Sequence, residues 1–187
     1  MKTETLVLAA LMTALVVVLQ FMGAFVRLGP FQCSLVLMPI VIGAALCGRK
    51  IGTWLGFVFG MVVLLNGDAA AFLTVNALGT IVTVLAKGTL CGFCAGLVYD
   101  LLQEKNKYLA VLAAAIACPV VNTGVFLLGC FVFFFETIES WGLAMGFGST
   151  IEYMIIGLVG GNFIFELLTN IVLCPAIVRI LNLRKKK

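Results

Sequence analysis

Long apolar segments, each approaching or exceeding the length that crosses a lipid bilayer, occupy most of this sequence. A spanning helix needs roughly 20 apolar residues because the hydrocarbon core is about 30 Å thick. The chain of 187 residues is 63% hydrophobic and 11% charged, whereas soluble domains carry about 25% charged residues. A water-soluble domain of this length could not bury so much apolar surface. The sequence therefore predicts an all-α integral membrane protein.

Turn signals divide the apolar sequence into six segments, with no polar stretch between them long enough for a separate soluble domain. We predict one transmembrane domain over residues 1–187, with helices at about 6–26, 35–47, 51–65, 78–102, 108–135 and 151–183. The second and third are short for complete spans and are separated only by Gly48, Arg49 and Lys50. A re-entrant pair is the structural alternative there. We favour two short or kinked spans because the distribution of basic residues requires them.

Basic residues are concentrated on one of the two sides that six helices would define. With the N-terminus inside, ten of the twelve basic residues fall on that side, while Arg27 lies outside and Lys87 within the membrane. The inner set comprises Lys2, Arg49, Lys50, Lys105, Lys107, Arg179, Arg184, Lys185, Lys186 and Lys187. The positive-inside rule then predicts that both termini are cytoplasmic. The basic C-terminal tail is interpreted as a topology anchor, not as a nucleic-acid site.

Residue types that catalysis and metal binding require are scarce. The chain has no histidine, and its seven cysteines lie almost entirely within apolar segments. Cys91 and Cys94 form a CxxC pair without a second pair, so we interpret the cysteines as small buried apolar residues. Neither a Walker motif nor a nucleophile elbow is present. We therefore expect no enzyme, no metal and no cofactor, and any ATP-driven step would need a separate ATPase.

Small residues recur at intervals of four in several predicted helices. They form the rows Gly52, Gly56 and Gly60; Gly88, Gly92 and Gly96; Gly157 and Gly161; and Ala10 and Ala14. Such rows let helix backbones approach closely in lipid, so we interpret the glycine rows as internal packing surfaces. The alanine pair differs because it lies at the cytoplasmic end of the first span. A flat patch there can also receive another subunit.

The segment TVLAKGTLCGF places one lysine, Lys87, inside a long apolar helix. It lies about nine residues from the predicted outer end, roughly 13 Å into the membrane at 1.5 Å per residue. Thr80 and Thr83 share its helix face at spacings of i, i+3 and i+7. A charge at this depth costs about 2.5–3.5 kcal/mol on insertion scales, so it predicts a functional site.

Two other predicted helices carry polar residues at similar depth. Asn162, Glu166 and Asn170 recur every four residues on one face of the last helix. In the fifth helix, Asn122 and Thr123 follow shortly after Pro119, which frees a backbone carbonyl. Lys87, Asn122, Asn162 and Glu166 can therefore converge from the last three helices.

This convergence has two interpretations. A Lys87–Glu166 ion pair could simply join two helices, but such a pair would not need the amides and hydroxyls at the same level. A pocket for a small polar ligand would need them. We therefore assign Lys87, Thr83, Asn122, Asn162 and Glu166 as candidate ligand-binding residues. We add Asn76 and Trp141 from the polar connection 66–76 and the glycine-containing connection 136–150, because such loops can close over a ligand.

The whole chain resembles the substrate-binding S component of an energy-coupling factor (ECF) vitamin transporter. The resemblance rests on six helices with both ends inside and on ALMTA at 10–14, which is similar to that family's AxxxA docking motif. The stretches LGPFQCSLVLMPIVIGAALCGRKIGTWLGFVFG (28–60) and CPVVNTGVFLLG (118–129) resemble the pantothenate-type members.

The resemblance implies a mechanism and partners. An S component of the prokaryotic cell membrane binds its vitamin from outside with high affinity, under the first, third and fifth loops. It then topples in the membrane while docked on a transmembrane coupling subunit, and two ATPase subunits supply the energy. Ala10 and Ala14 would form the docking surface. The ligand-binding residues above rest on helix depth and not on the resemblance.

Several substrates and functions stay open at this point. Pantothenate, with a carboxylate, hydroxyls and an amide, suits Lys87, Asn122 and Asn162. Riboflavin would need aromatic faces, and cobalamin or a folate would need a wider opening. A proton-coupled carrier or channel that uses Glu166 is the competing class, and it would transport without an ATPase. A membrane scaffold with a structural Lys87–Glu166 pair would bind no ligand.

Overall fold

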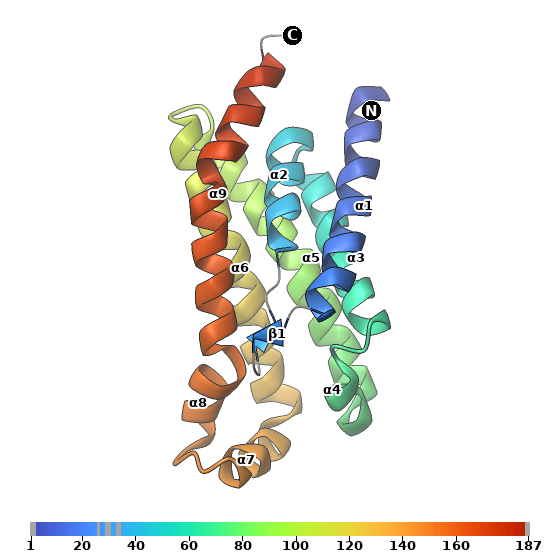
Figure 1. Cartoon of the computed structure of the whole chain (residues 1–187), viewed down its shortest axis with the longest axis vertical. Helices are drawn as coiled ribbons and strands as arrows, with labels where there is room; N and C mark the ends of the chain where they lie inside the picture. The colour runs from blue at the N-terminus through green and yellow to red at the C-terminus, as the bar shows by residue number, and fades with distance from the viewer. Residues whose placement is uncertain (1–2, 26, 29–30, 33–34, 186–187) are drawn as a thin grey trace.

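The computed structural model describes residues 3–25, 27–28, 31–32 and 35–185, and these are almost entirely helical (Figure 1). The long helices are α1 (Thr3–Phe25), α3 (Arg49–Leu65), α5 (Ala77–Leu102), α6 (Lys107–Phe133) and α9 (Gly161–Lys185). The shorter helices are α2 (Leu37–Cys47), α4 (Ala70–Val75), α7 (Phe135–Ala144) and α8 (Thr150–Glu152). A π-helix, η1 (Tyr153–Gly160), joins α8 to α9, and β1 (Arg27–Leu28) pairs antiparallel with β2 (Phe31–Gln32).

Within the described residues, four helices are long and apolar enough to cross a membrane, whereas the sequence predicted six spans. They are Thr3–Gly23, Ala77–Leu102, Lys107–Phe133 and Thr150–Arg179. Helix α3, with 17 residues, and α2, with 11, are shorter. Figure 1 shows the chain running up and down the bundle so that its two ends lie at the same end of the molecule. The chain is thus a multi-pass membrane protein.

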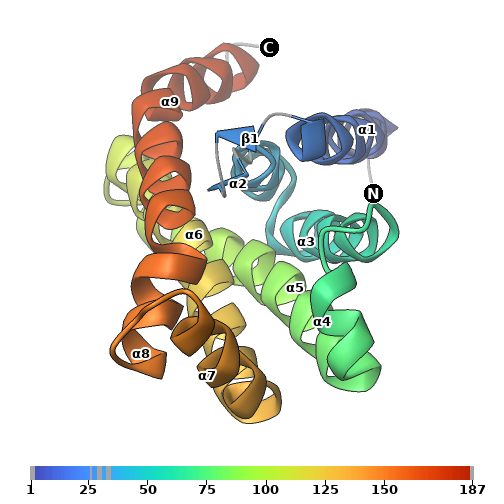
Figure 2. The same cartoon turned by 60° about the horizontal axis from the view of Figure 1, so that its bottom comes forward.

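The short second helix fills the centre of the bundle. Helix α2 contacts α1, α3, α5, α6 and α9, and Figure 2 shows it enclosed among them. Most of its residues are buried, including Leu37, Ile40, Val41 and Ala44. A helix that is apolar on every side lies either in a protein core or in lipid. In α2 the neighbouring helices supply much of that cover.

Glycine rows hold α3 and α5 in backbone contact. A Cβ atom at Gly60 would lie 2.9 Å from the Val84 carbonyl oxygen, and one at Gly52 would lie 2.7 Å from the Gly92 carbonyl oxygen. Gly56 and Gly88 face each other even more closely. In lipid, van der Waals contact of this kind is a main source of helix association. The interpretation of these two rows as internal packing surfaces is confirmed.

Two connections that the sequence analysis treated as loops contain helices. Helix α4 lies within 66–76, and α7 begins at Phe135 and covers the first part of 136–150. Their aromatic side chains pack together, because the Phe72 ring meets the rings of Phe126, Phe134 and Trp141 edge-on at centroid distances of 5.8, 5.1 and 5.5 Å. This cluster joins α4, α6 and α7 at the end of the bundle opposite the chain termini (Figure 1).

The α3–α5 contact predicts opposite effects for two glycine-to-alanine changes. Gly88→Ala places a methyl group against the Gly56 backbone, so overpacking should lower stability by about 1–3 kcal/mol. Gly124→Ala meets no atom within 4 Å and should leave stability unchanged or slightly raise it, because alanine favours helix. Thermal unfolding of both variants in detergent measures the difference. Equal melting temperatures would contradict the packing role of the glycine rows.

Candidate functional site

Lys87 lies near the middle of α5, with its ammonium between two aromatic rings. The Nζ atom is 5.1 Å from the centroid of Phe126 on α6 and 5.8 Å from that of Phe59 on α3. The electron-rich ring faces stabilise a cation at such distances. Among the described residues, no carboxylate oxygen lies within 4.0 Å of Nζ and no hydrogen bond holds it. The N–H groups of the ammonium therefore have no hydrogen-bond acceptor among the described residues.

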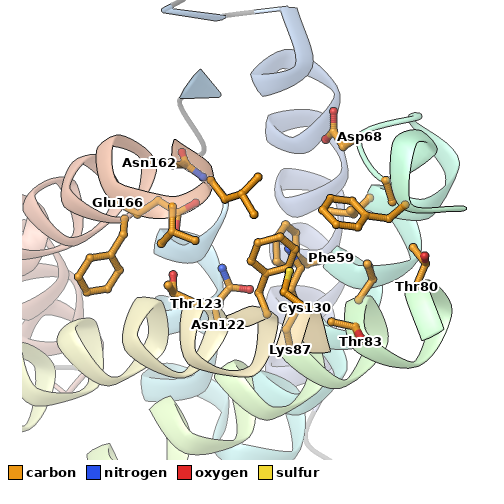
Figure 3. Close-up of a pocket in the computed structure, with 18 of the residues that line it drawn as sticks. Phe59, Asp68, Thr80, Thr83, Lys87, Asn122, Thr123, Cys130, Asn162 and Glu166 are labelled. Carbon is orange, nitrogen blue, oxygen red and sulfur yellow. The ribbon is translucent and has the colours of Figure 1, made fainter. Parts of the chain in front are cut away.

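A cavity of about 310 Å³ lies beside this lysine (Figure 3). Helices α1, α3, α4, α5, α6 and α9, the π-helix η1 and the turn before α4 contribute to its walls. Its polar lining comprises Gln20, Asp68, Thr80, Thr83, Lys87, Asn122, Thr123, Asn162 and Glu166. Its aromatic lining comprises Phe59, Phe72, Phe126, Phe134 and Phe163. The volume is at the lower end of the range of about 300–1,000 Å³ typical of small-molecule sites.

Buried polar atoms in this lining lack hydrogen-bond partners. They are Thr83 Oγ1, Asn122 Oδ1 and Asn162 Oδ1, from three different helices. Asn122 is only 6% exposed and Glu166 only 4%. Leaving such a group unsatisfied costs about 1–3 kcal/mol, and each exception in a native protein needs a reason. These atoms are free to accept hydrogen bonds from a molecule that enters the cavity, and the predicted polar ligand site stays a prediction.

Lys87 and Glu166 line the same cavity without forming an ion pair. The nitrogen and the carboxylate oxygens are more than 4.0 Å apart, and in Figure 3 the two side chains come from different walls. The structural alternative considered above, a direct Lys87–Glu166 pair, is therefore not formed. Both charged groups are available to a molecule that enters between them.

A hydrogen-bonded turn that the sequence analysis did not identify also borders the cavity. Asp68 Oδ2 accepts hydrogen bonds from Gln20 Nε2 and Asn66 Nδ2, both at 2.7 Å. These bonds connect α1 to the turn between α3 and α4. Gln20 is the one glutamine inside the first apolar segment, and this exception to the apolar pattern was the signal that could have revealed it.

Two of the predicted ligand-binding residues, Asn76 and Trp141, lie outside the cavity lining. Asn76 instead begins α5, where its Oδ1 accepts a hydrogen bond from the Gly79 amide at 2.9 Å. Trp141 packs behind Phe72, which does line the cavity. The other five predicted residues, Lys87, Thr83, Asn122, Asn162 and Glu166, all line it.

The predicted docking residues Ala10 and Ala14 are exposed on α1. Larger apolar side chains surround them, with Leu6 57%, Val7 62% and Leu11 57% exposed. On the opposite face of α1, Ala9 and Val16 are buried against the bundle. The small-residue patch therefore faces away from the protein, where either lipid or another membrane subunit can contact it.

Cysteines in the described bundle behave as apolar packing residues. Cys91, Cys118, Cys130 and Cys174 are buried free thiols. Cys91 Sγ donates to the Gly88 carbonyl oxygen at 3.1 Å. In the described part of the chain, no group of three or more histidine, cysteine, aspartate or glutamate residues is arranged to hold a metal ion.

A multi-pass helical bundle around a buried polar cavity is the architecture of a membrane transport protein. Comparison with known proteins identifies the family within this class. The family model described as "ECF transporter, substrate-specific component" matches residues 4–181, and the chain belongs to this family. It is a family of transporter components and not of enzymes.

One curated relative carries a substrate in its name. The chain is 25% identical over 191 residues to the pantothenic acid transporter PanT of Lactococcus lactis subsp. cremoris. This similarity covers 95% of the chain and 93% of the relative. No solved structure matches the chain.

The unsatisfied cavity atoms predict opposite stability effects for two asparagines. Asn122→Leu should stabilise the ligand-free protein by about 1 kcal/mol or more, because an unpaired buried amide is replaced by an apolar side chain of similar size. Asn76→Ala should destabilise it by about 1 kcal/mol, because α5 loses its N-cap. Thermal unfolding without ligand tests both. Destabilisation by Asn122→Leu would mean that Asn122 belongs to a structural hydrogen-bond network.

Proposed function

We propose that this protein is the vitamin-binding subunit of an ECF importer and that its substrate is pantothenate. It binds the vitamin from outside with high affinity and delivers it inward together with a transmembrane coupling subunit and two ATPase subunits. The observation that carries this proposal is the cavity in which Lys87 and three unsatisfied buried polar atoms face a common space. Family membership and similarity to PanT support the same assignment.

The chemistry of pantothenate complements that of the cavity. Its carboxylate can accept hydrogen bonds from the Lys87 ammonium, which forms no hydrogen bond or ion pair with a described side chain. Its hydroxyl and amide donors can satisfy Asn122 Oδ1 and Asn162 Oδ1, and the Thr83 hydroxyl can donate to the carboxylate. A cavity of about 310 Å³ favours a small, flexible vitamin over riboflavin, a folate or cobalamin. The lining phenylalanines cover the apolar parts of the ligand.

We further propose six membrane crossings, with the segment 35–47, which contains α2, as the second and α3 as the third. Both termini would be cytoplasmic, in the cell membrane of a prokaryote. Three observations support this topology: the alternating direction of the helices, the common end at which α1 begins and α9 ends, and the concentration of basic residues at that end. The cavity would then open on the outer half of the membrane.

Binding is tested with Lys87→Met and a matched control, Lys105→Met, which changes an exposed lysine in the turn between α5 and α6. Loss of a buried partner of a ligand charge typically costs about 2–5 kcal/mol, so Lys87→Met should weaken pantothenate binding about 30-fold or more. The control should bind as the wild type does. Native mass spectrometry identifies the co-purified ligand, and calorimetry measures its affinity.

Two outcomes of that experiment, and one of a separate transport assay, would contradict parts of the proposal. A wild-type protein that binds and is stabilised by no vitamin would favour a scaffold. A different vitamin would keep the class and change the substrate. Uptake into proteoliposomes without any ATPase would instead support a proton-coupled carrier that uses Glu166, which the described structure leaves without a hydrogen-bond partner.

Docking is tested on the exposed face of α1. Ala14→Trp adds a large side chain to the proposed docking patch and should abolish co-purification with the coupling subunit while preserving pantothenate affinity. Val172→Trp on α9 is the control, because Val172 is 72% exposed and lies on a different helix. Vitamin uptake by cells should fail for the first variant and persist for the second. Normal uptake by Ala14→Trp would exclude this face.

A further inference from the structure

The walls of the cavity carry opposite charges in separate places. Lys87 and Thr83 belong to α5, whereas Glu166 and Asn162 belong to α9. Figure 3 shows the two groups on different sides, with Asn122 of α6 between them in this view. A ligand that fills this space therefore meets the basic side chain of Lys87 on one wall and the acidic side chain of Glu166 on another.

The α5 wall suits a single carboxylate. Lys87 is the basic residue among those that line the cavity in the described structure. Its ammonium lies over Phe59 and Phe126, and Thr83 is one turn away on the same helix. The aromatic rings hold the ammonium in place but form no conventional hydrogen bond with its N–H groups. A carboxylate that approaches Lys87 can take those donors, and the Thr83 hydroxyl can donate to it as well.

The α9 wall suits neutral hydrogen-bond donors. Glu166 is buried, and Asn162 Oδ1 is buried without a partner one turn earlier on the same helix. Both groups present acceptor oxygens to the cavity. Hydroxyl groups on the ligand can donate to them, whereas a carboxylate or a phosphate there would face Glu166 across a cavity of low dielectric. Asp68, the other acid in the lining, is already bonded to Gln20 and Asn66.

We propose that the site binds its ligand in one orientation, with the carboxylate on Lys87 and the hydroxyl end at Glu166 and Asn162, so that Glu166 rejects phosphorylated forms of the vitamin. This inference rests on the proposed function. The site would thus select a monocarboxylate with a neutral polyhydroxy end. For pantothenate, the central amide would lie beside Asn122, and the free vitamin would be bound in preference to its phosphate ester on the primary hydroxyl.

Three ligands and two variants of the full chain test the orientation. The ligands are pantothenate, pantothenol, in which a hydroxymethyl group replaces the carboxylate, and 4′-phosphopantothenate. The variants are Lys87→Gln and Glu166→Gln, with Glu139→Gln as an exposed control outside the cavity. Affinities are measured by calorimetry in detergent, and thermal unfolding verifies that each variant is folded.

The expected pattern is specific to each wall. The wild type should bind pantothenate about 30-fold more tightly than either analogue. Lys87→Gln should make pantothenate and pantothenol bind equally. Glu166→Gln should still bind pantothenate more tightly than pantothenol. Its preference for pantothenate over the phosphate ester should fall about 10-fold or more. A rejection based on size alone would survive in Glu166→Gln, since glutamine is as large as glutamate.

Other results would overturn the orientation. If Glu166→Gln, and not Lys87→Gln, bound pantothenate and pantothenol equally, the carboxylate would lie at α9. An equal loss of both ligands in Lys87→Gln would show that Lys87 does not contact the carboxylate. If both variants fail to fold, wild-type protein that binds the phosphate ester or pantothenol as tightly as pantothenate still excludes the proposal. Wild-type protein that binds no pantothenate removes the proposed function itself, which distinguishes the two failures.

Discussion

Backbone contact between α3 and α5 is the constraint on which the site depends. Gly56 and Gly88 let the two helices approach until neither has room for a Cβ atom. Lys87 precedes this contact point in α5, and Phe59 lies one turn after Gly56 in α3. The same close approach therefore brings the Phe59 ring to 5.8 Å from the ammonium. In lipid, where apolar side chains gain nothing by leaving the solvent, glycine contacts can fix the position of a charged residue that lipid would reject.

The cavity has a structural cost that a ligand would offset. Its unsatisfied oxygens, Thr83 Oγ1, Asn122 Oδ1 and Asn162 Oδ1, each forgo a hydrogen bond in the ligand-free protein. The buried Glu166 carboxylate adds to this cost. A protein selected only for a stable bundle would pair these groups or replace them with apolar residues. Their arrangement around one space instead makes binding a source of stability, so ligand-bound protein should be the more rigid form.

Helix periodicity predicted which polar residues share the cavity, because residues on one helix face lie on one side of it; their role in binding stays a prediction. Spacings of three, four and seven residues placed Lys87 with Thr83 and Asn162 with Glu166, and all four line the cavity. Local spacing carried no information about the turn at Asp68, whose contact with Gln20 joins residues 48 positions apart. Asn76, predicted from its loop and not from spacing, lies outside the cavity lining and caps the N-terminus of α5. The short second segment likewise became clear only in three dimensions, because α2 is enclosed by five other helices.

Helix α1 links the proposed docking surface to the cavity. Its exposed face carries Ala10 and Ala14, while Gln20, six residues after Ala14, is buried and bonded to Asp68 at the border of the cavity. A straight helix transmits a tilt from one end to the other because its backbone hydrogen bonds resist bending. If a coupling subunit docks at the alanine patch as proposed, a shift of α1 relative to the other helices would either move the 66–68 turn or break the Gln20–Asp68 bond. Either change would alter the lining of the cavity, because Gln20 and Asp68 both belong to it.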